Sequence, residues 1–357
     1  MARRTDLTGR QAPRAQAARG GRRIHTSDSH VFRPVAPTTF PALSDDLPPV
    51  PETAPSEVLE LNRRIEEQTR DLPKAWDVGA PSMRQAREEG RSVFGPMLRS
   101  DRAENHIADT EMGPIGIRVT PPREEAHGVF VHIHGGGFVV GANHHHDPML
   151  ERLADATNLI VASVDYRLAP EDPYPAGPDD CEAGTRWLID NAAERFGSEV
   201  VAIGGESAGA SLAVVTILRL RDRHGLAPFK AALLPYGLYD HRLTPSVRSF
   251  GERPLIIDTP LCEWFTAQYT GGQQLDDPDV SPIFGRLHDM PPAMFLVGDQ
   301  DPLLDDTLFM AARWKAAGND AVLEVWPGAP HAWDYFDTDY ARAARARMYD
   351  FLNMRLG

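Results

Sequence analysis

The hydrophobic residues of this chain gather in short runs, and the segments between the runs carry apolar residues at helical spacing. From about residue 105 onward the runs have strand length and are almost wholly apolar, which is typical of parallel strands buried on both faces. The predicted strands are residues 116–122, 128–134, 158–166, 199–205, 230–236, 292–299 and 321–326. The predicted helices are residues 147–157, 178–195, 207–224, 303–317 and 338–354. This alternation predicts an α/β fold with a mostly parallel central sheet flanked by helices.

Two segments depart from the alternation. Residues 58–99 have a helical pattern, and residues 240–290 form a long interval that predicts helices outside the sheet. We therefore expect a helical cap, made of residues 51–104 and an insertion at about 240–280, over a catalytic domain that spans residues 105–357. Residues 1–50 are rich in Arg, Gly and Pro, and they predict a disordered tail and linker.

Composition narrows the classes of function. The 357 residues are 42% hydrophobic, enough for a large core, and the net charge of −14 argues against a nucleic-acid-binding surface. The two cysteines, Cys181 and Cys262, make no disulfide framework and favour a reducing, cytoplasmic location. The sequence contains no run of 18 apolar residues and therefore predicts no membrane-spanning helix. The arginine-rich start lacks the apolar region of an export signal, and we prefer a dispensable tail to the alternative of a transit peptide.

One short motif carries the first sign of chemistry. Residues 205–209, Gly-Glu-Ser-Ala-Gly, join a predicted strand to a predicted helix and match the pattern G-x-S-x-G. In a nucleophile elbow the serine sits on a strained turn, and the flanking glycines leave room where side chains would collide. The alternative is an ordinary glycine-rich turn, but the apolar strand before Ser207 and the helical pattern after it favour the elbow.

A nucleophilic serine needs a histidine to accept its proton, and with this elbow the partners follow in the order Ser, Asp or Glu, His. Of the 13 histidines, only His331 follows the acidic candidates along the chain. Four aspartates precede it after a predicted strand: Asp299, Asp301, Asp305 and Asp306. The last two fall at a helix start and suit the role of helix N-terminal charges. Spacing alone does not separate Asp299 from Asp301.

A second glycine-rich segment predicts the oxyanion hole. His134 and three glycines directly follow a predicted strand and match the HGGG type of oxyanion loop. We expect the N–H groups of Gly136, Gly137 and Ala208 to hold the oxyanion of a tetrahedral intermediate. His134 then serves to fix the loop rather than as a second base.

These motifs together resemble those of one family, the hormone-sensitive-lipase-like esterases of the α/β-hydrolase fold. The similar blocks are HGGGF (134–138), DYRLAPEDPYPAGPDD (165–180), GESAG (205–209), DVSPIFG (279–285), GDQDPLLDD (298–306) and PHAW (330–333). The resemblance covers residues 105–355, and the helical segment before them resembles the family's cap.

The resemblance implies a cofactor-free carboxylesterase that acts on small-molecule esters of short to medium acyl chains. It implies that Asp301 is the acid of a Ser-His-Asp triad and that Asp305 is a structural aspartate. His146 and Asp147 match residues that fix a loop. Family members often dimerise through the sheet edge, so a homodimer is possible, and neither a nucleic acid nor a membrane is expected as partner.

The substrate pocket is less well specified. Phe138 and Trp333 are candidates for its wall, and Glu206 adjoins the site at a position where the family usually has Asp or Thr. Ala210 also replaces a glycine that is common in the family. These differences leave the acyl preference open.

Two remaining features are predicted to be structural. Residues 143–147, Asn-His-His-His-Asp, predict no metal site, because adjacent histidines of one loop point in different directions and no further motif for a metal accompanies them. Arg167 and Glu171 are expected to pair and to brace the loop under the site.

The sequence therefore predicts a serine carboxylesterase that works through an acyl-enzyme. Hydrolysis of amides, lactones or carbonates by the same residues is the nearest alternative. Two further alternatives are a ligand-binding receptor that has lost hydrolysis and an interfacial lipase.

Overall fold

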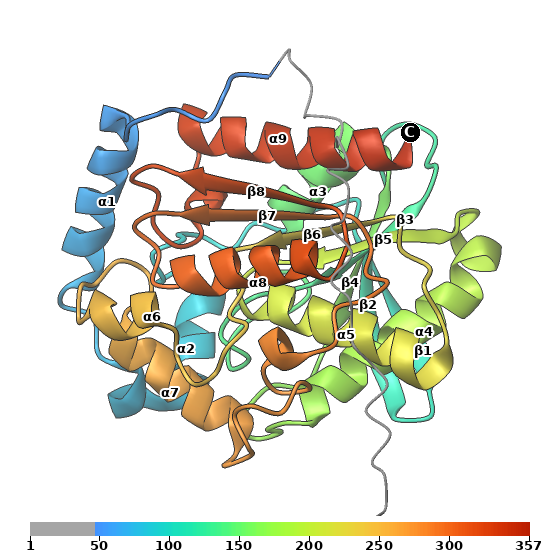
Figure 1. The fold of residues 1–357 in the computed structure, drawn as a ribbon, viewed down its shortest axis with the longest axis horizontal. Helices are drawn as coiled ribbons and strands as arrows, with labels where there is room; N and C mark the ends of the chain where they lie inside the picture. Colours follow the sequence, from blue (N-terminus) through green and yellow to red (C-terminus); the bar gives the residue numbers. More distant parts are fainter. Residues whose placement is uncertain (1–46) are drawn as a thin grey trace, which may run out of the picture. The chain divides into compact units, whose positions relative to one another are not determined.

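A computed structural model describes residues 47–357 of the chain, and the predicted tail before residue 47 lies outside them. Eight strands form one sheet in the order β1-β2-β4-β3-β5-β6-β7-β8 (Figure 1). The strands are β1 (Glu104–Thr110), β2 (Gly113–Thr120), β3 (Val129–Ile133), β4 (Ile160–Asp165), β5 (Val200–Gly205), β6 (Ala231–Pro235), β7 (Ala293–Gly298) and β8 (Ala321–Trp326). From β4 to β8 all neighbours are parallel, whereas β2 pairs antiparallel with both β1 and β4. The predicted α/β fold with a mostly parallel sheet is confirmed.

The first strand is the one that the hydrophobic pattern did not reveal. The sequence of β1, Glu-Asn-His-Ile-Ala-Asp-Thr, is mostly polar, and Ala108 is its only buried residue. An edge strand needs little apolar surface because only one side of it is paired. The central strands β3, β5, β6 and β7 are buried along their whole length, and their apolar sequences predicted them.

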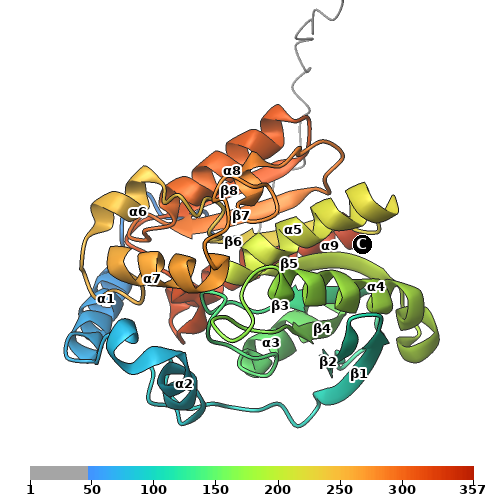
Figure 2. The same ribbon diagram turned by 90° about the horizontal axis from the view of Figure 1, so that it is seen from below.

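Helices cover both faces of the sheet (Figures 1 and 2). Helices α4 (Ala176–Phe196), α5 (Ala208–His224) and α8 (Leu304–Ala316) contribute buried side chains to the core on one face. Helices α3 (Asp147–Thr157) and α9 (Asp339–Leu356) contribute to the core on the other face. All five were predicted from the helical spacing, with ends that differ by at most two residues.

Four further helices lie at the carboxyl ends of the strands, on the side to which the arrowheads of β7 and β8 point in Figure 1. They are α1 (Ser56–Thr69), α2 (Ala75–Glu88), α6 (Pro245–Phe250) and α7 (Thr259–Thr270). Helix α2 kinks at Gly79, whose φ of 75° favours glycine, and Pro81 follows this kink. The sequence segments predicted as cap supply all four helices.

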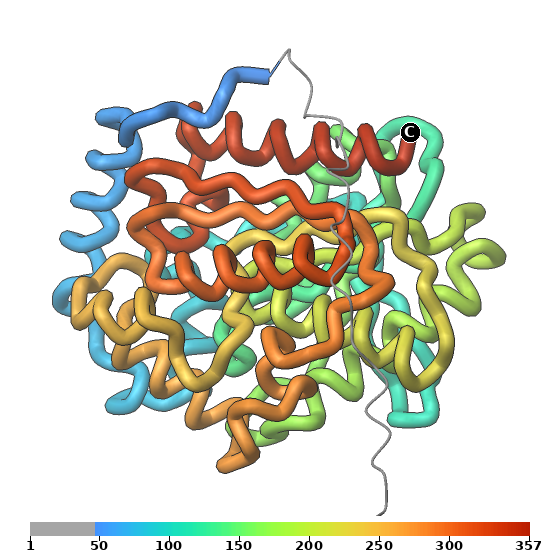
Figure 3. The backbone as a smooth tube through the Cα atoms, in the orientation of Figure 1, coloured from blue at the N-terminus to red at the C-terminus, as the bar shows by residue number. Residues whose placement is uncertain are grey.

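Helix α1 packs differently from α2. Its buried face, with Val58, Leu61 and Ile65, belongs to the core that α9 and β8 share. Asn62 donates from Nδ2 to the carbonyl oxygen of Gly328 (2.8 Å), and Glu57 accepts the first N–H groups of α9. The first described residues also run beside α9 (Figure 3). The two ends of the described chain thus share one core.

Among residues 47–357, the longest helices contain no window apolar enough to cross a membrane.

Candidate active site

The turn from β5 into α5 presents Ser207 in a strained conformation, with φ 56° and ψ −121°. A Cβ atom at Gly205 would lie 2.1 Å from the carbonyl oxygen of Ile133, and one at Gly209 would lie 1.9 Å from the same oxygen. Strand β3 therefore passes too close for any residue but glycine on either side of the serine. This close approach is the physical reason for the G-x-S-x-G pattern in this chain.

A chain of hydrogen bonds connects three residues from three different loops. His331 Nε2 lies 3.0 Å from Ser207 Oγ, and His331 Nδ1 lies 2.8 Å from Asp301 Oδ2. The distances suit a tautomer in which Nδ1–H donates to the carboxylate and Nε2 accepts the serine proton. Asp301 and His331 are 2% and 4% exposed, so water competes little for these bonds.

The structure places the other three aspartates in different environments. Asp299 accepts the N–H of Gly328 (2.7 Å), and Asp305 accepts the N–H of Ser246 (2.8 Å). Asp306 is fully buried and accepts the N–H groups of Tyr239 and Asp240 and the hydroxyl of Thr244. Burial raises the pKa of Asp306 to about 7 in spite of these bonds. Of the four aspartates, only Asp301 contacts His331. The spacing along the sequence had not separated Asp301 from Asp299.

The glycine-rich segment after β3 folds into a tight loop. Gly136 and Gly137 have φ of 119° and 61°, and a Cβ at Gly137 would lie 2.5 Å from the ring of Phe265. Among the described residues, no hydrogen bond uses the N–H groups of Gly136, Gly137 or Ala208. These donors are therefore available to a ligand, as an oxyanion hole requires.

His134 fixes this loop. Its Nδ1 lies 2.9 Å from the carbonyl oxygen of Gly135, and Tyr166 donates its hydroxyl to the carbonyl oxygen of His134 (2.8 Å). Burial lowers the pKa of His134 to about 3, so the imidazole stays neutral near pH 7. A neutral and fully buried ring suits a structural role.

Glu206 connects the elbow to the glycine loop. Its Oε1 accepts the N–H of Gly135 (2.6 Å), and its Oε2 lies 2.9 Å from His132 Nε2. Burial opposes the charge, but His146, His132 and the N–H of Gly135 together lower the pKa of Glu206 to about 2. Glu206 borders the cavity as predicted, but both carboxylate oxygens bind protein donors, so the residue positions the loop that holds Gly136 and Gly137.

Ser207 and His331 lie in the wall of a cavity of about 590 Å³. Its lining is largely apolar and comes from the glycine loop, from α2 and the segment after it, and from α7. Phe138 borders the cavity and stacks on Tyr269, with 3.9 Å between ring centroids. Trp333 does not, because it is fully buried against Tyr236 and Trp326, and its prediction as a wall residue is wrong.

The expected pair of Arg167 and Glu171 is also wrong. Arg167 instead binds Asp180, with 2.8 Å between Nη2 and Oδ1. Glu171 binds Arg84 of α2 (2.7 Å), which also donates to the carbonyl oxygens of Val139 and Ala169. Arg84 therefore attaches α2 to the loop beside the glycines, a function that no local pattern around Arg84 indicates.

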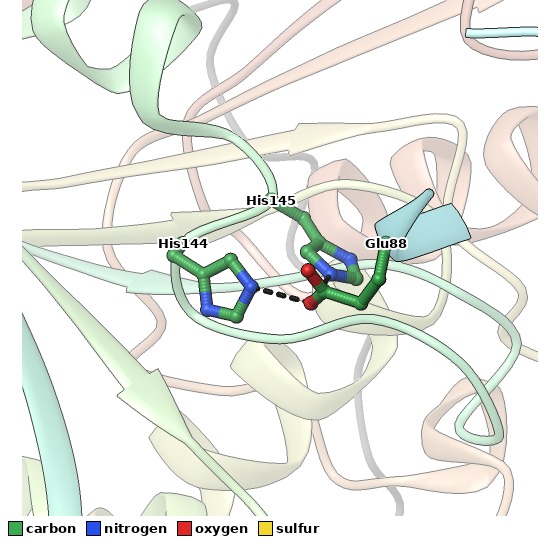
Figure 4. Close-up of side chains that lie close together, drawn as sticks. All are labelled: Glu88, His144 and His145. Atoms are coloured by element: carbon green, nitrogen blue, oxygen red, sulfur yellow. Dashed lines mark hydrogen bonds and ion pairs between the residues drawn. The ribbon is translucent and has the colours of Figure 1, made fainter. Parts of the chain in front are cut away.

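The histidine-rich loop has two parts. Asp147 is fully buried and pairs with Arg118, and the hydroxyl of Tyr335 contacts His146, so both residues fix the loop as the resemblance implies. The expectation that adjacent histidines point in different directions is wrong for His144 and His145. Both reach one carboxylate oxygen of Glu88, as Figure 4 shows.

Comparisons with known proteins agree with this architecture. A family model described as the alpha/beta hydrolase fold matches residues 130–335. Esterase LipI of Mycobacterium tuberculosis is 37% identical over 254 residues, which are 68% of this chain and 77% of the relative. An ethyl acetate hydrolase of Pseudomonas putida is 33% identical over 59% of this chain and 68% of its own length.

Solved structures give the same result. A hyperthermophilic esterase from the archaeon Pyrobaculum calidifontis superimposes with a TM-score of 0.77 at 30% identity, over 84% of this chain and 98% of the esterase. An esterase from the bacterial hormone-sensitive lipase family superimposes with a TM-score of 0.72 at 30% identity, over 85% of this chain and all of the other.

Proposed function

This chain belongs to the hormone-sensitive-lipase-like esterases of the α/β-hydrolase fold, and we propose that it hydrolyses short- to medium-chain acyl esters with Ser207 as the nucleophile. The observation that carries the proposal is the hydrogen-bonded series from Ser207 through His331 to Asp301 in the wall of an apolar cavity. A serine, a base and an orienting acid in this geometry suffice for acyl transfer.

In the proposed reaction, Ser207 Oγ attacks the ester carbonyl while His331 Nε2 takes its proton. The oxyanion accepts hydrogen bonds from the N–H groups of Gly136, Gly137 and Ala208. His331 then returns the proton to the leaving alcohol, which leaves Ser207 acylated. Water, deprotonated by the same nitrogen, attacks the acyl group and releases the acid and the free serine. Asp301 orients the imidazole and stabilises its charged form throughout.

Two observations support small and apolar acyl groups. The cavity of about 590 Å³ is in the range of pockets for small molecules, and its lining is mainly aliphatic and aromatic. The Pseudomonas putida relative is named for ethyl acetate, a short ester.

A rate series tests the proposal. Hydrolysis of p-nitrophenyl esters from acetate to palmitate is measured for the parent chain and for Ser207→Ala. We expect a maximum at short or medium chains and a loss of about 10⁴-fold or more in kcat for the variant. An unchanged circular dichroism spectrum controls for folding. Substantial hydrolysis by folded Ser207→Ala would refute the role of Ser207, and a maximum at palmitate would refute the proposed chain length.

A further inference from the structure

Glu88 lies at the end of α2, where it meets two consecutive histidines of the loop that follows the glycine segment (Figure 4). Its Oε1 lies 2.6 Å from Nε2 of His144 and 2.7 Å from Nε2 of His145. The three donor atoms lie within 4.8 Å of one another, and in the part of the chain that the structure describes no other group of three such residues does so. The loop and the helix are 56 residues apart, so the fold and not the sequence brings them together.

We propose that Glu88, His144 and His145 bind a divalent transition-metal ion, with Zn²⁺ as the best fit, and that this ion fastens α2 to the loop. Two imidazoles and one carboxylate are typical ligands of Zn²⁺, whereas Mg²⁺ and Ca²⁺ prefer oxygen ligands. The site is separate from the hydrolytic residues and supplies no step of ester cleavage.

The proton on His145 Nε2 must move to Nδ1 when the ion binds, because one ring nitrogen of a neutral imidazole carries a proton. Nδ1 of His145 is buried and has no hydrogen-bond partner among the described residues, so it is free to take this proton. The same nitrogen lacks the outer acceptor that strengthens most metal-bound histidines, and we expect a moderate affinity for that reason.

Glu88 is accessible to solvent, and its two carboxylate oxygens have different partners. The side chain of Glu88 is 42% exposed, and Arg99 holds its other oxygen, Oε2, at 3.2 Å, which leaves Oε1 for the metal. Zinc bonds of about 2.0–2.2 Å in a tetrahedral site separate the ligand atoms by about 3.3 Å. Each Nε2 atom would have to move less than about 1 Å further from Oε1 to reach this separation.

Such an ion would act on the wall of the catalytic cavity. His145 and Arg87, the neighbour of Glu88, both border the cavity that contains Ser207. Arg84 already attaches the middle of α2 to the hydrolase core, and the ion would attach its end. The proposal therefore predicts that Zn²⁺ reduces the local opening of α2.

Calorimetric titration of the EDTA-treated, tag-free full chain with ZnCl₂ tests the proposal directly. We expect one Zn²⁺ per chain, a rise in Tm, and slower amide hydrogen exchange in residues 85–91 and 142–146. The variants Glu88→Gln and His144→Ala should each lower the affinity about tenfold or more. Gln can still accept hydrogen bonds from both histidines, so Glu88→Gln separates loss of the metal from loss of the hydrogen-bonded contact.

Two controls make the result decisive. His288→Ala removes an exposed histidine that contacts Asp289 and is not part of the proposed site, and it should bind Zn²⁺ like the parent. A chain with His25→Ala and His30→Ala tests the histidines that precede the described residues. Absence of binding by the parent chain, equal affinity in Glu88→Gln and His144→Ala, or loss of binding in either control would overturn the proposal, and the three residues would then form only a hydrogen-bonded contact.

Discussion

The carbonyl oxygen of Ile133 lies 1.9 Å from the position that a Cβ atom would occupy at Gly209. The last residue of β3 and the second residue of α5 are thus in contact through their backbones. Because β3 leads into the glycine loop and α5 begins beside Ser207, this contact sets the spacing between the proposed oxyanion donors and the nucleophile.

Gly209→Ala should therefore destabilise the protein. The added methyl group meets two backbone carbonyls, of Ile133 and His134, and neither can rotate away as a side chain would. We expect a loss of about 3 kcal/mol or more in the free energy of unfolding, measured by urea titration. Gly177→Ala is the matched control, because its nearest neighbouring atom is 3.3 Å away and its position is helical. Equal stability of the two variants would contradict the steric argument.

Asp301→Asn should lower kcat by about 10⁴-fold with little change in folding. An amide in place of the carboxylate can no longer select the tautomer of His331 that accepts the serine proton, nor stabilise its charged form. Asp299 lies two residues away and accepts hydrogen bonds from the N–H of Gly328 and from Nε2 of Gln300, not from His331, so Asp299→Asn should keep most of the activity. The kcat values of both variants on p-nitrophenyl butyrate decide between the two aspartates; a reversed order would assign the acid to Asp299.

Replacement of Glu206 should affect kcat more than KM. Glu206→Ala removes the acceptor of the Gly135 N–H, so the loop with Gly136 and Gly137 loses its anchor to the elbow. We expect a loss on the order of 10²-fold in kcat, as for an impaired oxyanion hole. Glu206→Gln keeps one acceptor oxygen and should recover part of this loss. A rise in KM at constant kcat would show instead that Glu206 binds the substrate.

The stability of the protein should depend on the charge of Asp306. Its pKa in the folded state is about 7, above the ordinary value of 3.8, so the folded state binds a proton more tightly than the unfolded state. This contribution is fully present below about pH 4 and is lost as the pH rises through 7, on the order of a few kcal/mol in total.

Asp306→Asn keeps a neutral side chain that can accept from Tyr239 and donate to Thr244. Urea unfolding at several pH values between 4 and 8 should show the parent losing stability relative to this variant as the pH rises. A constant difference across that range would show that Asp306 titrates near its ordinary pKa.

Much of the fold was predictable because it depends on local pattern. Apolar runs predict the strands that are buried on both faces, and the spacing of apolar residues predicts the helices between them. The sequence of β1 is polar and gives no such signal, because this strand is stabilised by its pairing with β2. The motif around Ser207 was visible because close backbone contacts demand glycine at two fixed positions. Steric constraints of this kind restrict the residue type at a position and can therefore be recognised in the sequence.

Long-range pairing was not predictable in the same way. Spacing gives no reason to prefer Asp301 over Asp299, since both follow β7, and only the path of the loop decides which one faces His331. Trp333 adjoins the site in sequence, yet the 3-10 turn Trp333–Tyr335 places it in the core. The partner of Glu171 comes from α2, 87 residues earlier in the chain.

The different packing of α1 and α2 determines where this enzyme can be recombined with its relatives. Helix α1 shares a core with α9 and β8 and binds Gly328 in the strand-to-His331 connection, and it borders the cavity only with its last residue, Thr69. Helix α2 instead contributes several residues to the cavity lining. A chimera that exchanges the pocket wall should therefore be joined within residues 70–74, between the two helices. A junction placed before α1 would exchange the helix that binds the loop leading to His331 together with the helix that borders the cavity. Effects on the proposed triad and effects on substrate choice could then not be separated.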